Sequence, residues 1–576
     1  MMAAIGDSRP ALATSQIDLE ILRTRIIACT EELAASLASA APISEMSQAS
    51  QFVVAIADTD GNVAAIDDAQ QLGSIERTVG HVIEYFKFDL GDGDVVLTND
   101  PYIGGTRVQE VTLVAPLIIG GELVLYLAVG VHLRDMGGQL GGNLYPDATE
   151  ILAEGVLVTP MKVQRMGRPV RDVLGVFLLN GRRPDETRSS LRTAIATLEL
   201  GQQRLGDLVS SYGHNAVVEA LQYSQDYTER LARRVFTTWT PGSHDGGRCL
   251  SLSGTSDTPI NVRLTATVED GTVTLDFSDS DDQRPMFVNC PVGVTASRSY
   301  SVILTMLAGG VPPNSGLSRV VHVRTRPGSV VHPVFPAPCG WGNIHCGNEI
   351  ADAVAEALSH ASEQALGSLS VPRPLILCRQ KDNRSDQTDL GVWGIGGASA
   401  SAQGSGWGPP RLSARAQLQS IEQWETETGL GLQVQCQEFA QDSGGAGEHV
   451  GAPGVDTVIA LAGDRLYTLW TDASSPVRGV AGGLPGGGME IAFHTTDGWI
   501  PAPPSASEST ISADFLRLRL AGGGGYGSPR DRAPASIEDD LADGLISETS
   551  AREIYQLALN HPDGVGAPME GSDHND

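Results

Sequence analysis

The chain has 576 residues, which is enough for two to four domains or for one large, elaborated domain. Hydrophobic residues make up 41% and charged residues 19% of the chain, a composition typical of a globular protein rather than a disordered one. The formal net charge of −30 argues against a nucleic-acid partner, because phosphate binding requires clustered lysine and arginine side chains.

Targeting segments and disulfides are not predicted. The sequence contains no run of about 18 apolar residues, so no membrane span is expected. Residues 1–15 lack the basic region and apolar core of a secretory signal and are predicted to be a disordered leader. The seven cysteines are scattered and odd in number, which indicates the reducing cytoplasm rather than a disulfide framework.

In the first half of the chain, hydrophobic periodicity predicts helices and hairpins. Two hairpins are expected, one with its turn at Asp60-Gly61 and one with its turn at Gly120-Gly121. The predicted helices have apolar residues near a 3.6-residue spacing, and we interpret those after residue 184 as scaffold or subunit packing. The ranges are a helix at 17–41, hairpins at 51–66 and 111–131, and helices at 191–209 and 216–234.

The second half of the chain mixes strands with helices. Strand-like runs on both sides of Asp270-Gly271 predict an antiparallel sheet between residues 249 and 280. A helix is predicted at 350–366, strands after residue 430, and a further helical segment at 537–559. Between residues 382 and 414, glycine, serine and other polar residues dominate, which indicates a long loop.

These elements predict a mixed α+β fold with a large, multi-sheet, antiparallel or mixed β core and helical insertions. The expected division is a disordered leader, an N-terminal α+β domain, a β-rich domain, a C-terminal α+β domain and a disordered tail. Their boundaries are 1–15, 16–240, 241–330, 331–560 and 561–576.

Two glycine-rich runs have a composition that phosphate-binding loops share. Residues 482–488 read GGLPGGG and residues 522–525 read GGGG. Neither run has the Lys-Ser/Thr pair of a P-loop or lies between a predicted strand and helix. We therefore interpret them as tight turns with positive φ rather than as phosphate cradles.

One segment carries the clearest resemblance to a known family. Residues 98–112 read TNDPYIGGTRVQEVT, and residues 132–138 read HLRDMGG. Together they resemble the signature of the hydantoinase B/5-oxoprolinase family, roughly N-D-P-Y-x-G-G-T-H-x-x-D followed by H-x-x-D-x-G-G. Further hallmarks follow in order over most of the chain, at 145–155 (YPDATEILAEG), 289–291 (NCP), 442–447 (DSGGAG) and 522–527 (GGGGYG). The resemblance implies a hydantoinase B-like fold.

The resemblance also implies a metal site, and here this chain differs from the family. The family's ligand positions correspond to Gln51, Arg107, Glu110 and His132, so arginine replaces a histidine and glutamate an aspartate. An arginine side chain stays protonated and has no lone pair for a metal. Two like charges about 4 Å apart repel by roughly 4 kcal/mol at an effective dielectric constant of 20. We therefore expect that the usual Zn or Mn site is lost and that Arg107 pairs with Glu110, although Glu110 and His132 with Asp100 or Asp135 offer a rearranged site.

Four residues are candidates for catalysis. Arg107 has the planar donor fork that suits a carboxylate or bicarbonate. His132, Asp135 and Asp100 are candidates for proton transfer, since histidine titrates near neutral pH. The structural alternatives are that Asp100 caps the turn at Pro101 and that Asp135 orients His132.

The resemblance implies a subunit of an ATP-dependent enzyme complex in the cytoplasm. The partner would be a hydantoinase A-type, actin-like ATPase subunit that holds ATP and Mg²⁺, and a small third subunit is a further candidate. The substrate would be a small molecule, either a cyclic amide such as a hydantoin, 5-oxoproline or a lactam, which is hydrolysed, or a ketone, which is carboxylated. A third hypothesis is a non-catalytic subunit of the hetero-oligomer with a degenerate metal site.

Overall fold

The fold was analysed in a computed structural model, which mixes helices with antiparallel and mixed sheets and confirms the predicted α+β class. The structure describes residues 14–557 except 41–51, 134, 141–143, 251–258, 308–309, 363, 365, 370–373, 381–395, 409–419, 423–424, 426–432, 462–463 and 472–476. No described helix combines the length and the apolar character that a membrane crossing requires.

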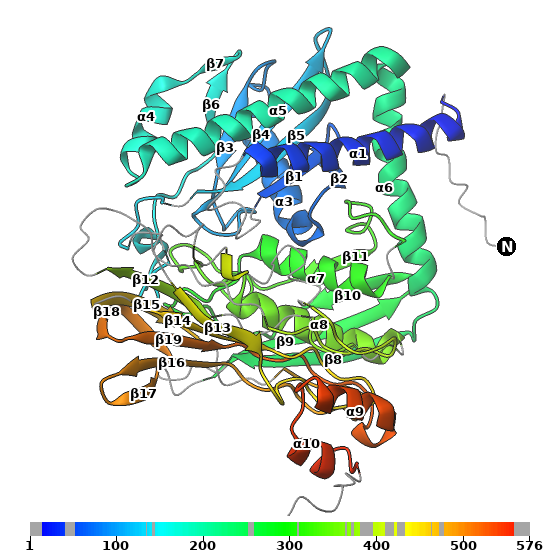
Figure 1. The fold of residues 1–576 in the computed structure, drawn as a ribbon. Helices are drawn as coiled ribbons and strands as arrows, with labels where there is room; N and C mark the ends of the chain where they lie inside the picture. Colours follow the sequence, from blue (N-terminus) through cyan, green and yellow to red (C-terminus); the bar gives the residue numbers. More distant parts are fainter. Residues whose placement is uncertain are drawn as a thin grey trace, which may run out of the picture.

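A seven-stranded antiparallel sheet forms the upper part of the molecule (Figure 1). Successive residues of the strand at residues 52–57 face opposite sides of the sheet. Val54 and Ile56 enter one hydrophobic core, and Val53 and Ala55 enter another. Both faces of the sheet are therefore buried. The strand order is β2 (Val63–Ile66), β1 (Phe52–Ala57), β5 (Glu122–His132), β4 (Glu110–Ile119), β3 (Val95–Thr98), β6 (Met161–Arg165) and β7 (Arg168–Pro169).

Helices cover both faces of this sheet. One core joins the sheet to α1 (Gln16–Ala40), α5 (Pro184–Tyr212) and α6 (His214–Phe236). The other core contains buried residues of α3 (Leu72–Tyr85), which follows the short helix η1 (Ala69–Gln71). The predicted helices at 17–41, 191–209 and 216–234 and both predicted hairpins are confirmed. Two further elements, η2 (Ile151–Ala153) and α4 (Arg171–Leu179), lie between β5 and α5 in the chain.

A second layer lies below the first in Figure 1. Its sheet has the order β11 (Val321–Arg324), β10 (Thr272–Asp276), β9 (Ile260–Glu269) and β8 (Gly242–Leu250), with β10 and β11 parallel. The helix α7 (Val292–Met306) packs against α3, and α8 (His345–Ser362) packs against β8 and β9. The predicted helix at 350–366 therefore exists but begins five residues earlier.

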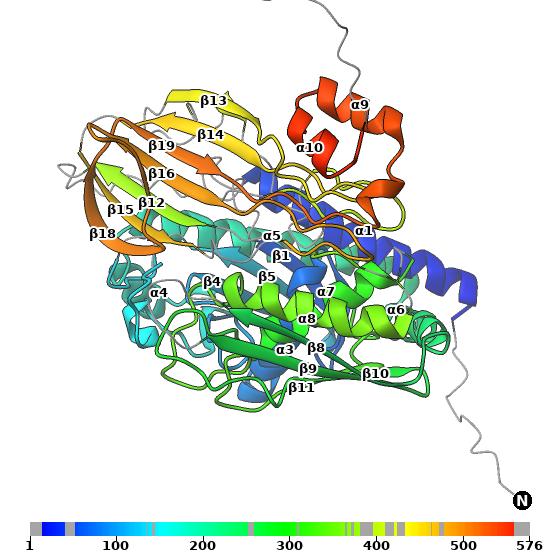
Figure 2. The ribbon, with the colours of Figure 1, turned by 90° about the horizontal axis from the view of Figure 1, so that it is seen from below.

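Two smaller sheets form the C-terminal part, on the other side of α8 from β8–β11 in the view from below (Figure 2). They share a hydrophobic core that includes Ile376, Leu469 and Phe493. One has the order β12 (Leu375–Gln380), β15 (Asp464–Trp470) and β18 (Ser505–Ser512). The other has the order β13 (Gln433–Phe439), β14 (Val455–Ala460), β19 (Phe515–Arg519), β16 (Glu490–Thr495) and β17 (Gly498–Pro501).

The predicted helical segment at 537–559 is divided. It forms α9 (Pro534–Ala542) and α10 (Glu548–Glu553), after the short helix η5 (Pro529–Asp531). Gly544 has φ +72°, a conformation that ends a helix and that glycine adopts without steric cost. Within the predicted loop at 382–414, residues 396–408 contain no helix or strand, and the rest lies outside the described residues.

The prediction of tight turns for the glycine runs is wrong at residues 522–525, none of which has positive φ. These glycines instead lie directly against other backbone segments. The amide of Gly445 donates to the carbonyl of Gly523 at 2.8 Å, and the amide of Gly525 donates to the carbonyl of Leu484 at 2.9 Å. A Cβ atom on Gly525 would lie 2.3 Å from the carbonyl oxygen of Ala446, so the packing excludes any side chain there.

Candidate functional site

The β4–β5 hairpin places Glu110 and His132 directly opposite each other, Glu110 as the first residue of β4 and His132 as the last of β5. Opposite residues of an antiparallel pair have Cβ atoms about 5 Å apart. The hairpin therefore brings together two residues that are twenty-two positions apart in the sequence. Gln51 precedes the first residue of β1 and lies outside the described residues.

The loop before β4 is held by its own backbone and by one asparagine. The carbonyl of Asp100 accepts a hydrogen bond from the amide of Gly105 at 2.9 Å. Asn99 is buried, and its Nδ2 donates to the carbonyl of Val108 at 2.7 Å. Its Oδ1 accepts from the amide of Val158 at 2.6 Å, which ties the loop to the segment just before β6. These bonds fix the backbone on both sides of Arg107.

Arg107 is fully buried, with no exposed surface. Its Nε donates to Oε1 of Glu110 at 2.9 Å, so the expected ion pair is present. The hydroxyl of Thr106 donates to the other carboxylate oxygen of Glu110. Both oxygens of Glu110 are thus engaged, and its side chain keeps only 12% of its surface exposed. A buried ion pair with additional hydrogen bonds has a fixed geometry.

His132 is held in its neutral form. The residue is half-buried, and its Nδ1 atom is buried and has no hydrogen-bond partner among the described residues. Burial, followed by the positive charge of Arg107, lowers the pKa of His132 well below 6.5. The imidazole is therefore uncharged at neutral pH and is able to accept a proton.

A second buried carboxyl group, that of Glu154, lies within the electric field of Arg107. Its two oxygens accept hydrogen bonds from the backbone amides of Cys339 at 3.0 Å and Gly340 at 2.8 Å. Burial raises the pKa of Glu154 to about 8. The two amides and the positive charge of Arg107 lower this pKa, but burial has the larger effect. Glu154 therefore titrates near neutral pH.

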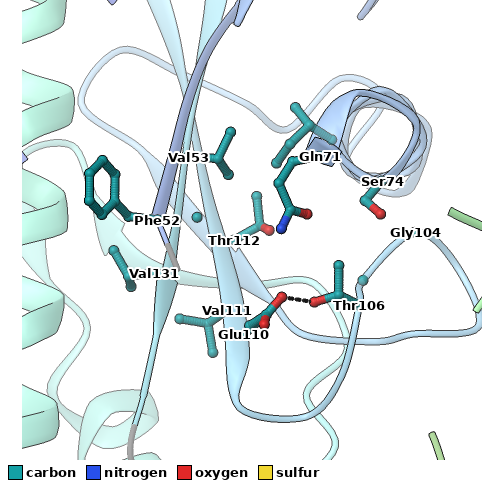
Figure 3. A pocket seen from close by; sticks show the side chains of 13 residues that line it. Phe52, Val53, Gln71, Ser74, Gly104, Thr106, Glu110, Val111, Thr112 and Val131 are labelled. Carbon is teal, nitrogen blue, oxygen red and sulfur yellow. Dashed lines mark hydrogen bonds between the residues drawn. The ribbon is translucent and has the colours of Figure 1, made fainter. Parts of the chain in front are cut away.

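A pocket of about 320 Å³, counting its open mouth, lies beside Glu110. Figure 3 shows the side chain of Gln71 extending from the start of α3 toward Thr112, with Val53 on the same side of the strand and Phe52 and Val131 on the other. Val53 and Ile75 belong to the hydrophobic core on the Gln71 side, whereas Phe52 and Val131 pack into the core on the far face of the sheet. Its lining residues are Phe52, Val53, Gln71, Ser74, Ile75, Gly104, Gly105, Thr106, Glu110, Val111, Thr112, Gly130 and Val131.

The other two predicted site residues are committed to turns. Oδ1 of Asp100 accepts from the amide of Tyr102 at 2.9 Å, the capping arrangement expected before Pro101. Burial raises the pKa of Asp100. Asp135 is buried and accepts from the amide of Gly137 at 2.9 Å and from Nη1 of Arg182 at 3.1 Å. Among the described residues, neither aspartate is hydrogen-bonded to the Arg107–Glu110 pair or to His132.

These side chains do not fit a divalent metal of the family's form. At the position that the resemblance assigns to a metal-binding histidine, the structure holds the buried guanidinium of Arg107, which offers a positive charge in place of a lone pair. The carboxylate of Glu110 is already bonded to Arg107 and Thr106. In the described part of the chain, no three His, Cys, Asp or Glu side chains lie together as metal ligands would.

Three residues of this region were absent from the predicted site. Thr106 immediately precedes Arg107 in the signature block, so its proximity to Glu110 was open to prediction. Glu154 belongs to the 145–155 block, but its amide partners are more than 180 residues away. Gln71 lies in no recognised block, and only the packing of α3 against the sheet places it at the pocket.

Comparisons with known proteins agree with the sequence motifs. A family model described as Hydantoinase B/oxoprolinase matches residues 15–529, which confirms the resemblance. An uncharacterized protein of Methanocaldococcus jannaschii is 25% identical over 565 residues, covering 94% of this chain and 96% of that protein. Caprolactamase subunit beta of Pseudomonas jessenii is 28% identical over 540 residues, covering 87% and 88%.

Two solved structures share the fold. The crystal structure of ATP-dependent caprolactamase from Pseudomonas jessenii has a TM-score of 0.85 at 23% identity and covers 96% of this chain and 98% of that chain. A nucleotide-free structure of acetone carboxylase also has a TM-score of 0.85, at 18% identity, and covers 96% and 82%. At these identities the structures establish a common architecture.

Proposed function

The chain belongs to the hydantoinase B/oxoprolinase family, and we propose that it is the subunit of an ATP-dependent complex that hydrolyses a small cyclic amide. Its relatives include ATP-dependent amidohydrolases and carboxylases. The proposed partner is an actin-like ATPase subunit, which holds ATP and Mg²⁺ and supplies the phosphoryl group that activates the amide oxygen. Hydantoins, 5-oxoproline and lactams are the substrate class.

The pocket beside Glu110 carries this proposal. Val53 and Ile75 offer apolar contacts for a small ring. Gln71 and Thr112 beside them offer a donor and acceptors that complement the N–H and C=O groups of an amide.

We propose that neutral His132 accepts the proton of the attacking water. The water oxygen bonds to the activated carbonyl carbon, and the C–N bond then breaks, so that the ring nitrogen takes up a proton and leaves as an amine while an acyl phosphate remains. A second water hydrolyses the acyl phosphate to the carboxylate and inorganic phosphate. A histidine must be uncharged to accept this proton, and the lowered pKa of His132 meets that condition. Asp100, beside the signature loop with its pKa raised by burial, is the second candidate for proton transfer.

Arg107 is a positioning residue in this proposal. It does not line the pocket and has no exposed surface, so it acts through Glu110 and through its field at His132. We propose that its guanidinium takes the place of the family's divalent cation. Asp135 likewise positions the segment after His132, since its carboxylate bonds to Gly137 and Arg182.

Ketone carboxylation is the second candidate, because the fold is shared with acetone carboxylase. The buried position of Arg107 argues against a direct contact with bicarbonate, which favours the hydrolase. A non-catalytic subunit is the third candidate, since a cation stands where the family has a ligand.

Purification of the tagged chain from its native host tests the proposal. We expect an actin-like ATPase subunit to co-purify and the complex to open the ring of caprolactam, 5-oxoproline or a hydantoin only with ATP. Bicarbonate-dependent consumption of acetone would instead establish the carboxylase. His132→Ala should lower ring opening by at least two orders of magnitude, as loss of a general base does. An unchanged rate in His132→Ala and Arg107→Ala would leave only the non-catalytic role.

A further inference from the structure

An apolar and basic surface lies on α4 and on the β6–β7 hairpin that packs beside it, at the upper left of Figure 1. Its apolar members are Met166, Val176 and Leu179, which are 78%, 65% and 85% exposed. Its arginines Arg165, Arg168 and Arg171 are also exposed. We call these six residues the α4 surface.

The helix α4 is apolar on its outer side as well as on its inner side. Phe177 and Leu178 are buried. Val176 and Leu179 are three residues apart, so they share the opposite, solvent-facing side of the helix. A helix at the surface of an isolated protein normally carries polar residues there, and a cluster of large exposed apolar side chains marks an interaction site.

The charge of this region is opposite to that of the whole chain. Residues 165–192 contain seven arginines and three acidic residues, a net charge of +4, whereas the chain has −30. Two arginines at the start of α5 are paired locally: Arg183, just before the helix, with Glu186, and Arg188, within it, with Asp185. The arginines of the α4 surface form no ion pair within the described part of the chain. Unpaired arginines around exposed apolar residues are typical of protein interfaces.

We propose that the α4 surface is the docking site for the ATPase partner subunit, through a patch on that subunit with an apolar centre and an acidic rim. This inference rests on the proposed function. The occupant is a different protein rather than a second copy of this chain. In a symmetric dimer the same patch meets itself, and arginine would then face arginine.

The α4 surface is connected to the candidate site through Arg182. This residue follows α4 closely in the chain, and 37% of its side chain is exposed. Its Nη1 lies 3.1 Å from Oδ2 of Asp135, and its Nη2 donates to the carbonyl of Gly138 at 2.6 Å. These contacts hold the segment that begins three residues after His132. A subunit docked on α4 therefore lies beside the side chain that fixes this segment.

The test compares two surface variants with two controls in purification from the native host. Val176→Asp/Leu179→Asp places charge in the apolar centre, and Arg168→Glu/Arg171→Glu reverses the rim. Ile17→Asp and Arg530→Glu are matched controls: Ile17 is 74% exposed at the start of α1, and Arg530 is exposed in η5. Thermal unfolding of each isolated variant should match the wild type, because all six positions are at the surface.

We expect the surface variants to recover the actin-like ATPase subunit, identified by mass, at least about tenfold less than the wild type, the loss expected for residues at the centre of an interface. The controls should recover it fully. Equal recovery by wild type and surface variants would overturn the α4 docking site and leave the proposed function standing, whereas failure of the wild type to recover any such subunit would overturn both. Dimerisation of the isolated chain, or binding to vesicles of anionic phospholipid, that is lost in the surface variants would assign the α4 surface to those occupants instead.

Discussion

Replacement of Arg107 by histidine should convert the candidate site into a metal site. Nε of Arg107 lies 2.9 Å from Oε1 of Glu110. A Zn²⁺ or Co²⁺ ion bound to that carboxylate would lie about 2 Å from the oxygen, and so roughly 4 to 5 Å from the guanidinium. In the wild-type protein, the full positive charge of the Arg107 guanidinium therefore repels a cation bound there.

The size of the effect follows from that distance. A unit charge about 4 Å away contributes roughly 4 kcal/mol at an effective dielectric constant of 20. This free energy corresponds to about 10³ in a dissociation constant. Arg107→His removes the charge and adds an imidazole ligand beside Glu110 and His132. The affinity for Zn²⁺ or Co²⁺ should therefore rise by three orders of magnitude or more, on the scale of that estimate.

Calorimetric titration with Zn²⁺ measures the affinity, and the visible spectrum of bound Co²⁺ reports the ligand geometry. Arg107→Lys is the matched control, because it retains a positive charge and should gain nothing. Two results would refute the reasoning. One is a stoichiometric transition metal in the wild-type protein as purified. The other is an equal affinity in Arg107→His and Arg107→Lys.

Three further predictions concern stability. Arg107→Leu leaves the Glu110 carboxylate buried without its counter-charge and should lower the free energy of unfolding by about 3 to 5 kcal/mol. Urea denaturation measures this change, and a loss below about 1 kcal/mol would contradict the pairing. Glu154 has a folded pKa of about 8 against 4.5 in its unperturbed state, so the native chain holds a proton that the unfolded chain has lost. Its contribution to stability should therefore be full below pH 4.5 and fall as pH rises through about 8, and Glu154→Gln should flatten that decline. For His132 the sign is reversed, because its pKa in the folded protein lies well below 6.5 and the unfolded chain therefore binds the extra proton. The stability of the protein should therefore fall as pH falls below 6.5. The variant His132→Gln should remove that part of the acid sensitivity.

The sequence was sufficient for elements with a strong local pattern. The turn at Gly120-Gly121 and its alternating flanks predicted the β4–β5 hairpin. An arginine in place of the family's metal-binding histidine predicted the pair of Arg107 with Glu110, because the guanidinium can fill the charge role of the missing ion three residues away in the chain. In both cases the interacting groups are close in the chain or joined by a hairpin, so local geometry restricts their positions.

Residues with distant partners required the tertiary structure. Asp135 was a candidate for orienting His132, but its carboxylate accepts from Arg182, 47 residues away. The amides of Cys339 and Gly340 reach Glu154 only because the second layer packs against the first. A sequence pattern records which face of an element is apolar, but it does not record which distant segment covers that face.

The glycine runs show the same division between sequence and tertiary structure. The sequence determined that residues 522–525 have no side chains, and from this a positive φ was inferred. The structure shows that the absence of a side chain serves contact instead, with Gly523 and Gly525 bonded to backbone from other segments. Glycine permits both unusual dihedral angles and close approach, and the sequence is the same for either. Only the tertiary packing, which brings backbones within about 3 Å of each other, decided between them.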